Sequence, residues 1–340
     1  MSRPRVVHVY KDVYPPVQGG IERIVNLLAR LTADRFETRV IVAARSVRRV
    51  ERAIEGGVPV TEIPSLGRLL SAPLAPGFLG ELRRCRADLL HFHVPHPTGE
   101  LAFLLSGLRT PAVATYHSDV VRQRWAMGAY GPFFHRFLSR MSVIMPTSRR
   151  YLETSPWLAR HMERCRVVPL GYPLEDYAAT PQIERRAEAL RAEHGDYVLF
   201  LGCLRPYKGL FNLLMAVGLL PQARLLIAGD GAMAPRLREG ARRMGVADRV
   251  RFLGFVDQPE AVALLRGAAM LVLPSHQRSE AYGLCQIEAM ACATPVVSTD
   301  LPTGVPEVNA HGVSGLVVPP QEPYALADAI RALLADPARR

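Results

Sequence analysis

The chain has 340 residues, of which 49% are hydrophobic, 7% aromatic and 21% charged. This composition excludes disordered and fibrous proteins, and the length favours two domains of roughly 150 residues. No apolar run reaches the roughly 18 residues that a membrane-spanning helix needs, and the opening MSRPRVVHVY lacks the apolar core of a signal peptide. We therefore expect a globular, cytoplasmic protein.

The distribution of charge and the spacing of the cysteines indicate which partners and which kinds of site the protein could have. Residues 1–175 carry 25 basic and 14 acidic side chains, whereas residues 176–340 carry 17 of each, so the whole net charge of +11 lies in the first half. A one-sided basic domain favours an anionic partner, such as a membrane surface, a phosphorylated acceptor or nucleic acid; the alternative is a solvated arginine-rich face. The five cysteines form no CxxC pair, which argues against a disulfide framework or a zinc site.

Short apolar strands alternate with helical segments along the chain. RVVHVY is followed by the turn-rich KDVYPPVQGG and the helical IERIVNLLARLTA, and the pattern recurs through ETRVIVAA, DLLHFHV, PAVATYH and VIMPTS. It restarts after residue 195 with YVLFLG, ARLLIAGDG, VRFLGFV, MLVLPS, PVVSTD and SGLVVPP. This alternation predicts an α/β protein of two doubly wound halves, residues 1–175 and 176–340, facing a shared cleft. In such sheets, ligands bind at the carboxyl ends of the strands.

Two glycine-containing segments follow predicted strands. Gly19 and Gly20 in QGGIE precede a helix, where a backbone can approach a phosphate closely; an ordinary turn is the alternative. In LGCLRPYKGL, Arg205 and Lys208 lie three residues apart just after a strand, and such cations can bind a diphosphate. Lys208 is one of only two lysines in the chain, which argues against a merely solvated turn.

The segment SEAYGLCQIEAMACATPVV places two carboxylates around a helix start. Glu280 precedes the helix and Glu288 lies inside it, among apolar and small residues. Gly283 and Leu284 lie between them, where backbone amides can face a sugar or anionic oxygen. Carboxylates accept hydrogen bonds from paired hydroxyls, so a ribose or hexose is a natural ligand. The alternative is a pair of surface charges.

Histidines gather at predicted strand ends in the first half. His117 closes the strand PAVATYH, with Asp119 two residues further on, and such a histidine can donate to a sugar hydroxyl. His91, His93 and His96 in HFHVPH invite a metal assignment, but no acidic ligand set accompanies them. We predict hydrogen-bonded core histidines and no metal.

Taken together, these motifs resemble the retaining, two-domain GT-B glycosyltransferases called group 1, or family 4. The resemblance extends from GGIE to GLVVPPQEPYALADAI, and its most specific element is Glu280 and Glu288 within SEAYGLCQIEAMACATPVV. TYHSDVVRQ and LRPYKGL are similar to bacterial mannosyl- and glucosyltransferases that build surface polysaccharides. The resemblance implies a nucleoside diphosphate sugar, GDP-mannose or a UDP-sugar, as donor and neither a metal nor another cofactor.

The resemblance also implies a role for each site residue. Arg205 and Lys208 would hold the diphosphate, Glu288 the ribose hydroxyls and Glu280 the hydroxyls of the transferred sugar. The backbone amides of Leu284 and Cys285 would contribute, His117 would contact the donor sugar, and Phe255 lies where the family holds the base. Gly19 and Gly20 would let the first domain approach the donor, and Asp119 and Arg122 are candidates on the acceptor side. Many members carry arginine where this chain has Cys203, so Arg205 would supply that charge.

The resulting hypothesis is transfer of a hexose, with retention, to a hydroxyl of a glycan or lipid-linked acceptor. The first domain would take the acceptor and contact an anionic membrane, and the second would bind the nucleotide sugar. A nucleotide-sugar epimerase of similar architecture is the alternative among enzymes. A basic nucleic-acid-binding protein is the alternative from another class, although the sequence shows no reading helix; VVRQRWAMGAYGPFFHRFLSR favours acceptor or membrane contact, or a core helix.

Overall fold

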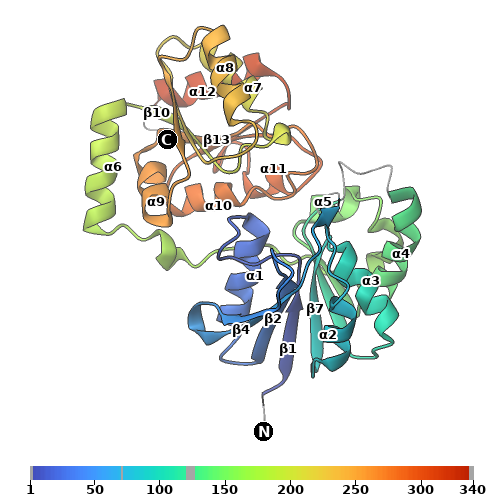
Figure 1. Cartoon of the computed structure of the whole chain (residues 1–340). Coiled ribbons are helices and arrows are strands. Elements are labelled where there is room, and N and C mark those ends of the chain that lie inside the picture. The colour runs from blue at the N-terminus through green and yellow to red at the C-terminus, as the bar shows by residue number, and fades with distance from the viewer. Residues whose placement is uncertain (1–2, 70–71, 120–126, 337–340) are drawn as a thin grey trace. The chain divides into compact units, whose positions relative to one another are not determined.

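The computed structural model of the chain describes residues 3–69, 72–119 and 127–336. The chain divides into two compact units, Met1–Leu170 and Gly171–Arg340, each built on its own sheet (Figure 1). Arg122 and the first residues of the segment 120–140 lie outside the described residues.

The first unit contains a seven-stranded sheet in the order β3-β4-β2-β1-β7-β8-β9. Its pairs are parallel except β3 with β4. The strands are β1 (Arg5–Val9), β2 (Glu37–Ala43), β3 (Val50–Ala53), β4 (Pro59–Ile63), β7 (Leu89–Val94), β8 (Ala112–Tyr116) and β9 (Val143–Pro146). A short antiparallel pair, β5 (Arg68–Leu69) and β6 (Ala72–Pro73), stands apart from it.

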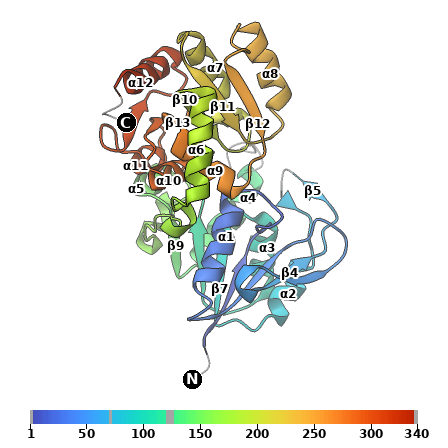
Figure 2. The ribbon, with the colours of Figure 1, turned by 90° about the vertical axis from the view of Figure 1, so that its left-hand side faces the viewer.

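Helices cover both faces of this sheet. They are α1 (Gly20–Leu31), α2 (Phe78–Arg84), α3 (Pro97–Ser106), α4 (Met127–Ser139) and α5 (Arg149–Thr154), with 3-10 turns η1 (Glu55–Gly57) and η3 (Ala159–Arg164). On one face, Val25 and Ala29 of α1 pack with Tyr10 and Val40; Figure 2 shows α1 in front of the sheet. On the other face, rings from β7, α3 and α4 pack together: Phe92, Phe103 and Phe137.

The second unit contains a six-stranded parallel sheet in the order β12-β11-β10-β13-β14-β15. Its strands are β10 (Tyr197–Leu201), β11 (Arg224–Ala228), β12 (Val250–Gly254), β13 (Met270–Leu273), β14 (Val296–Thr299) and β15 (Gly315–Val318). The central strands, such as MLVL of β13, are buried along their whole length. Continuous apolar runs of this kind are expected where helices cover both faces of a parallel sheet.

Two helical layers flank the second sheet. The helices are α6 (Pro181–His194), α7 (Leu210–Gly218), α8 (Ala234–Arg243), α9 (Gln258–Gly267), α10 (Leu284–Ala291), α11 (Val305–Val308) and α12 (Pro323–Ala335), with 3-10 turns η4 (Leu174–Tyr177) and η5 (Pro206–Lys208). One core joins α7, α8 and α12 to the sheet, and another joins α6, α9 and α10 to its opposite face (Figure 1). Side chains cap two of these helices, because Thr180 accepts from the Ile183 amide and Asp257 from the Glu260 amide.

The prediction of an α/β fold with two doubly wound, Rossmann-like domains is therefore confirmed. Among the described residues, every helix is too short or too polar to span a bilayer. Because all strands of the two large sheets except β3 run parallel, the loops that follow them gather at one edge, which is where ligand-binding side chains are expected.

Candidate functional site

A buried ion pair lies at the carboxyl edge of the second sheet. Lys208 follows β10 and Glu280 follows β13, the strand paired with β10. Nζ of Lys208 lies 2.5 Å from Oε2 of Glu280, and the Ser275 hydroxyl donates to the same oxygen at 2.9 Å. Both of these contacts fall on Oε2, and no hydrogen bond or ion pair from the described residues falls on Oε1 of Glu280.

Gly209 explains how the two loops come close enough to form this pair. Its φ is +69°, and a Cβ built on it would lie 1.9 Å from the carbonyl oxygen of Pro274. The His276 amide, in the loop after β13, donates to the Tyr207 carbonyl at 2.9 Å. Only glycine combines this left-handed backbone with such a close approach. The residue after Lys208 therefore determines where the ammonium group lies.

The electrostatics of the pair favour a charged lysine. Burial is the largest single influence and lowers the pKa of Lys208, but the charge and hydrogen bond of Glu280, together with Tyr207 and Cys285, more than offset burial and raise that pKa above its usual value. The ammonium group has three N–H donors and directs one of them toward Glu280. It therefore brings a permanent positive charge, with donor capacity to spare, to the edge of the sheet.

The N-terminus of α10 lies after the same loop. Gly283, with φ +72°, precedes the helix, and Leu284 and Cys285 form its first turn, where backbone amides have no intrahelical acceptor. Glu288 lies one turn further on, is buried, and accepts a hydrogen bond at 3.2 Å from the Tyr177 hydroxyl. Burial, and then the Glu288 charge, raises the pKa of Tyr177, which keeps this hydroxyl a donor.

The other predicted residues of the second unit follow neighbouring strands. Arg205 and Cys203 are exposed in the loop after β10. Phe255 follows β12 directly and is 59% exposed. Burial raises the pKa of the Cys285 thiol to about 12, so this cysteine is uncharged beside the helix start. The structure thus joins Lys208 directly to Glu280 and carries the remaining candidates on loops of the same sheet edge.

In the first unit, His117 ends a chain of buried imidazoles. Nε2 of His117 lies 3.0 Å from Nδ1 of His93, and Nε2 of His93 lies 3.1 Å from Nδ1 of His8. Next to this chain, Nε2 of His91 lies 2.7 Å from Oγ1 of Thr115. Burial lowers the pKa of His8 to about 4 and, with help from Lys11, that of His117 to about 3. These rings are therefore neutral at physiological pH.

The histidines that could hold a metal differ from those the sequence suggested. His8, His91 and His93 offer ligand nitrogens within 4.8 Å of one another, whereas the ring of His96 packs edge-on against Phe78, with 5.0 Å between centroids. Both nitrogens of His93 are engaged by other histidines. His91 and His93 are hydrogen-bonded as predicted, and His8 is a member of the cluster that the sequence did not reveal. His96 is buried, but neither of its ring nitrogens has a hydrogen-bond partner among the described residues, so the prediction of hydrogen bonding is wrong for His96.

Asp119, expected on the acceptor side, is held inside the first unit. Its Oδ1 accepts from the hydroxyls of Tyr116 at 2.8 Å and Ser155 at 2.7 Å. These bonds tie the end of β8 to the segment after α5, which is a structural role. At the start of α1, Gly19 is the residue before the helix, and a Cβ there would meet the carboxylate of Glu22 at 1.8 Å; Gly20 is exposed as the first helical residue.

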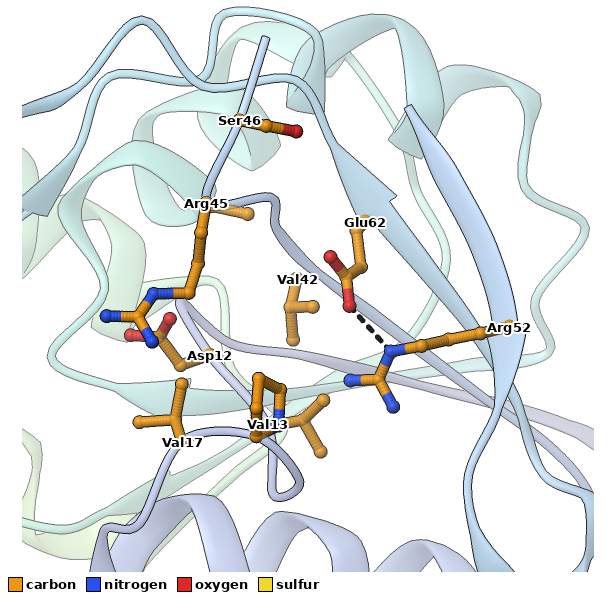
Figure 3. Close-up of a pocket in the computed structure, with 10 residues that line it drawn as sticks. Asp12, Val13, Val17, Val42, Arg45, Ser46, Arg52 and Glu62 are labelled. Carbon is orange, nitrogen blue, oxygen red and sulfur yellow. Dashed lines mark hydrogen bonds and ion pairs between the residues drawn. The ribbon is translucent and has the colours of Figure 1, made fainter. Parts of the chain in front are cut away.

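A cavity of about 210 Å³, not foreseen from the sequence and lined more by apolar than by polar surface, opens beside the ends of β1 and β2 (Figure 3). Its apolar floor includes Val13 and Val42, and Arg45 lines it as an exposed side chain. Arg52 on its wall pairs with Glu62 at 2.6 Å. Such a mixture of arginines, carboxylates and small apolar groups suits a polar ligand with several hydroxyl or anionic oxygens.

Three residues that contact the candidate residues were not predicted from the sequence: Ser275, Tyr177 and His8. Ser275 closes the apolar run MLVLPS and could have been found as the polar residue after a buried strand. Tyr177 lies far from Glu288 in sequence, and His8 lies inside a strand of core residues, so neither carried a local signal.

Both halves of the chain match models of glycosyltransferase families. Residues 18–175 match "Glycosyltransferase Family 4" and residues 181–340 match "Glycosyl transferases group 1". The D-rhamnosyltransferase WbpZ of Pseudomonas aeruginosa is 33% identical over 98% of this chain and 87% of its own. The O-antigen chain mannosyltransferase C of Escherichia coli is 30% identical over 97% of this chain and 88% of its own.

Solved structures share the fold at lower identity. Sucrose-phosphate synthase from Thermosynechococcus elongatus aligns with a TM-score of 0.83 at 23% identity, over 99% of this chain and 91% of that one. Anabaena Alr3699/HepE, in complex with UDP and glucose, aligns with a TM-score of 0.80 at 20% identity, over 99% and 91%. The fold is therefore GT-B, and the chain belongs to the group 1, or family 4, retaining glycosyltransferases, hexosyltransferases that use nucleotide sugars and typically need no metal.

Proposed function

We propose that this enzyme transfers a hexose from GDP-mannose or a UDP-sugar to a hydroxyl of a glycan or lipid-linked acceptor during polysaccharide synthesis, with retention. The observation that carries the proposal is the buried Lys208–Glu280 pair beside the N-terminus of α10. Relatives that transfer D-rhamnose and mannose support a sugar of mannose configuration. A structural neighbour bound to UDP and glucose supports the UDP-sugar alternative.

Lys208 and Arg205 hold the donor diphosphate in this proposal. The Lys208 ammonium keeps its charge through Glu280 and has further N–H donors for phosphate oxygens. Arg205 is exposed in the same loop and offers a planar fork for bidentate binding. As the sugar–phosphate bond breaks, negative charge grows on the leaving oxygen, and fixed cations and helix amides stabilise it.

The two carboxylates select the hydroxyl groups of the donor. Glu280 accepts from the transferred sugar through Oε1, while Oε2 stays with Lys208 and Ser275. Glu288 accepts from the ribose diol, and Tyr177 holds the carboxylate in place. The amides of Leu284 and Cys285 face the donor oxygens at the helix start, and the exposed ring of Phe255 stacks on the base.

The proposed chemistry is a same-face substitution. The bond between the anomeric carbon and the diphosphate oxygen breaks and an oxocarbenium-like sugar forms; the acceptor hydroxyl then bonds to that carbon from the side that the diphosphate vacates and gives its proton to the departing diphosphate. His117 contacts the sugar near the reacting carbon, and Gly19 and Gly20 allow the first unit's backbone to approach the donor. Retention follows from attack on the departing face, so no side chain has to serve as a covalent nucleophile.

The acceptor belongs to the first unit in this proposal. Residues 1–175 carry all of the net positive charge, which favours contact with an anionic membrane surface where a lipid-linked acceptor resides. Asp119 and Arg122 remain acceptor-side candidates; the internal bonds of Asp119 favour an indirect role for it.

A panel of nucleotide sugars tests the proposal directly. Thermal unfolding is followed with GDP-, UDP- and ADP-sugars, since a ligand that binds only the folded state raises the melting temperature. The stabilising donor is then incubated with and without a glycan acceptor, and the anomeric configuration of the product is determined by NMR. No stabilisation by any donor, product of inverted configuration, or an epimerised donor without acceptor would each contradict the proposal.

A further inference from the structure

Three histidines from three neighbouring strands form one hydrogen-bonded row. His8 lies on β1, His93 on β7, and His117 directly follows β8. The bonds between them measure 3.1 Å and 3.0 Å, and consecutive rings are stacked with centroids 5.4 Å and 5.3 Å apart. The three residues are 2%, 0% and 4% exposed. The row therefore runs through the interior of the first unit and ends at the carboxyl edge of the sheet.

The row has only two neutral proton arrangements. Burial holds each ring neutral at physiological pH, so each carries one proton. Each hydrogen bond needs one N–H and one lone pair. If His8 carries its proton on Nδ1, then His93 and His117 must also carry theirs on Nδ1. If His8 carries it on Nε2, all three carry it on Nε2.

The two ends of the row distinguish these arrangements. Nε2 of His8 and Nδ1 of His117 are both buried without a hydrogen-bond partner in the described chain. A buried N–H without an acceptor is the rarer kind of orphan group in proteins. Either arrangement leaves one N–H without an acceptor in the described chain; with every proton on Nδ1 this N–H is at His117, where the sugar of the proposed function would supply the acceptor.

We propose that His93 and His8 are positioning residues that hold His117 in its Nδ1–H form, so that it donates a hydrogen bond to a sugar oxygen. The contact to sugar rests on the proposed function; the coupling between the rings does not. A metal on His8, His91 and His93 is the less favoured use of these groups, because it would require both hydrogen bonds of His93 to break.

The first measurement needs no substrate. In full-length protein labelled with ¹⁵N-histidine, two-bond ¹⁵N–¹H correlations report which nitrogen of each ring carries the proton. We expect Nδ1–H for His8, His93 and His117 at pH 7.5. Different tautomers at His8 and His117, Nε2–H at all three rings, or a charged ring among them would overturn the proposal.

A matched pair of variants tests the coupling over distance. His8→Asn offers an amide N–H where Nδ1 stood and should keep His117 in its Nδ1–H form. His8→Asp has nearly the same shape as His8→Asn. Once its carboxyl loses its proton with rising pH, the side chain can only accept a hydrogen bond, so His117 should then switch to Nε2–H. The coupling between the rings would be contradicted if the tautomer of His117 did not change when this carboxyl ionises, or if His93 became charged instead.

Kinetics then connect the row to transfer. We expect kcat in His8→Asp to fall at least about tenfold below that of His8→Asn, with the donor KM within about threefold, because a wrong tautomer impairs the reacting complex and not donor binding. Equal kcat values in two folded variants whose tautomers differ would overturn the role in positioning. If neither variant folds, the wild-type tautomers decide. Concordant tautomers in an enzyme that transfers no sugar would refute the proposed function and leave the coupling intact.

Discussion

The ammonium group of Lys208 lies 2.5 Å from Oε2 of Glu280, and both side chains are buried. Removing one partner of a buried pair leaves an uncompensated charge and typically destabilises a protein by about 3–5 kcal/mol, whereas replacing both with apolar residues leaves no lone charge and is often nearly neutral when the volume is kept. Stability and activity should therefore respond differently to changes at these two positions.

We predict that Lys208→Ala abolishes transfer and also lowers the free energy of unfolding. The double variant Lys208→Ala with Glu280→Ala should recover most of that stability and none of the activity, because the lone charge is gone but the diphosphate has lost its cation. Urea unfolding and transfer assays on the two single variants and the double variant provide the cycle. Turnover near the wild-type rate in Lys208→Ala would rule out its role at the diphosphate.

Variants of Glu288 and Tyr177 separate the proposed contact of Glu288 with the ribose from the hydrogen bond by which Tyr177 supports the Glu288 carboxylate. Glu288→Ala should raise the donor KM about 10- to 100-fold, since hydrogen bonds to a charged group contribute about 1.5–3 kcal/mol each. Tyr177→Phe, which keeps the carboxylate and removes one hydroxyl at 3.2 Å, should raise KM only about threefold. Steady-state kinetics with varied donor distinguish the two, and equal effects would indicate that Glu288 acts structurally.

Gly209 and Gly245 form a matched pair of left-handed glycines, with φ values of +69° and +67°. Gly245→Ala meets no atom within 4 Å and should cost only about 1–2 kcal/mol of backbone strain. Gly209→Ala carries the same strain and a Cβ 1.9 Å from the Pro274 carbonyl oxygen, so it should lose more stability and most of the activity. Similar unfolding free energies for the two variants would mean that the loops do not need their close approach.

Glu100 provides a pH test in the first unit. Burial raises its pKa to about 8, although the His96 backbone amide donates to Oε1 at 2.5 Å. Between pH 6.5 and 8 the folded protein keeps this proton and the unfolded chain does not, so the Glu100 contribution to stability should fall as pH rises, by up to about 1.4 kcal/mol per pH unit. The buried histidines oppose this trend near pH 6.5, because they are neutral in the folded protein and partly protonated in the unfolded chain, so the Glu100 contribution is obtained as the difference between the wild type and a Glu100 variant.

The variant Glu100→Gln should lose this negative contribution to the slope, because the amide oxygen can still accept from the His96 amide and no proton is lost, while the contribution of the histidines stays the same. Guanidinium unfolding at pH 6.5, 7.2 and 8.0 measures the slope. The exposed Glu175→Gln serves as the control and should keep the wild-type slope. An unchanged slope in Glu100→Gln would show that this carboxyl does not hold its proton in the folded state.

The sequence predicted the fold well because its signals are local. MLVL becomes a strand buried along its whole length and YVLFL one buried except at its last residue, and helices begin directly after the capping residues Thr180 and Asp257. The sequence also placed Lys208 and Glu280 at one sheet edge, since both follow parallel strands. It could not pair them, because their contact depends on Gly209 passing close to the Pro274 carbonyl, a relation between segments far apart in the chain.

In the first unit, even more of the contacts join segments far apart in the chain, and the sequence could not predict them. His8 reads as one residue of a core strand, and only the pairing of β1 with β7 brings it to His93. His96 lies within the motif HFHVPH, yet the turn after β7 directs it to Phe78 and away from the other histidines. Asp119 follows a strand end as a ligand-binding residue does, but the hydroxyls of Tyr116, on the preceding strand, and Ser155, later in the chain, donate to its carboxylate.

Cys203 is the most accessible of the five thiols: Cys165 and Cys292 are buried, and Cys85 and Cys285 are only partly exposed. It stands two residues before Arg205, on the loop that carries Lys208. An environment-sensitive maleimide dye should therefore react there first, without any engineered cysteine. A fluorophore attached to Cys203 could therefore report the binding and release of a nucleotide in real time.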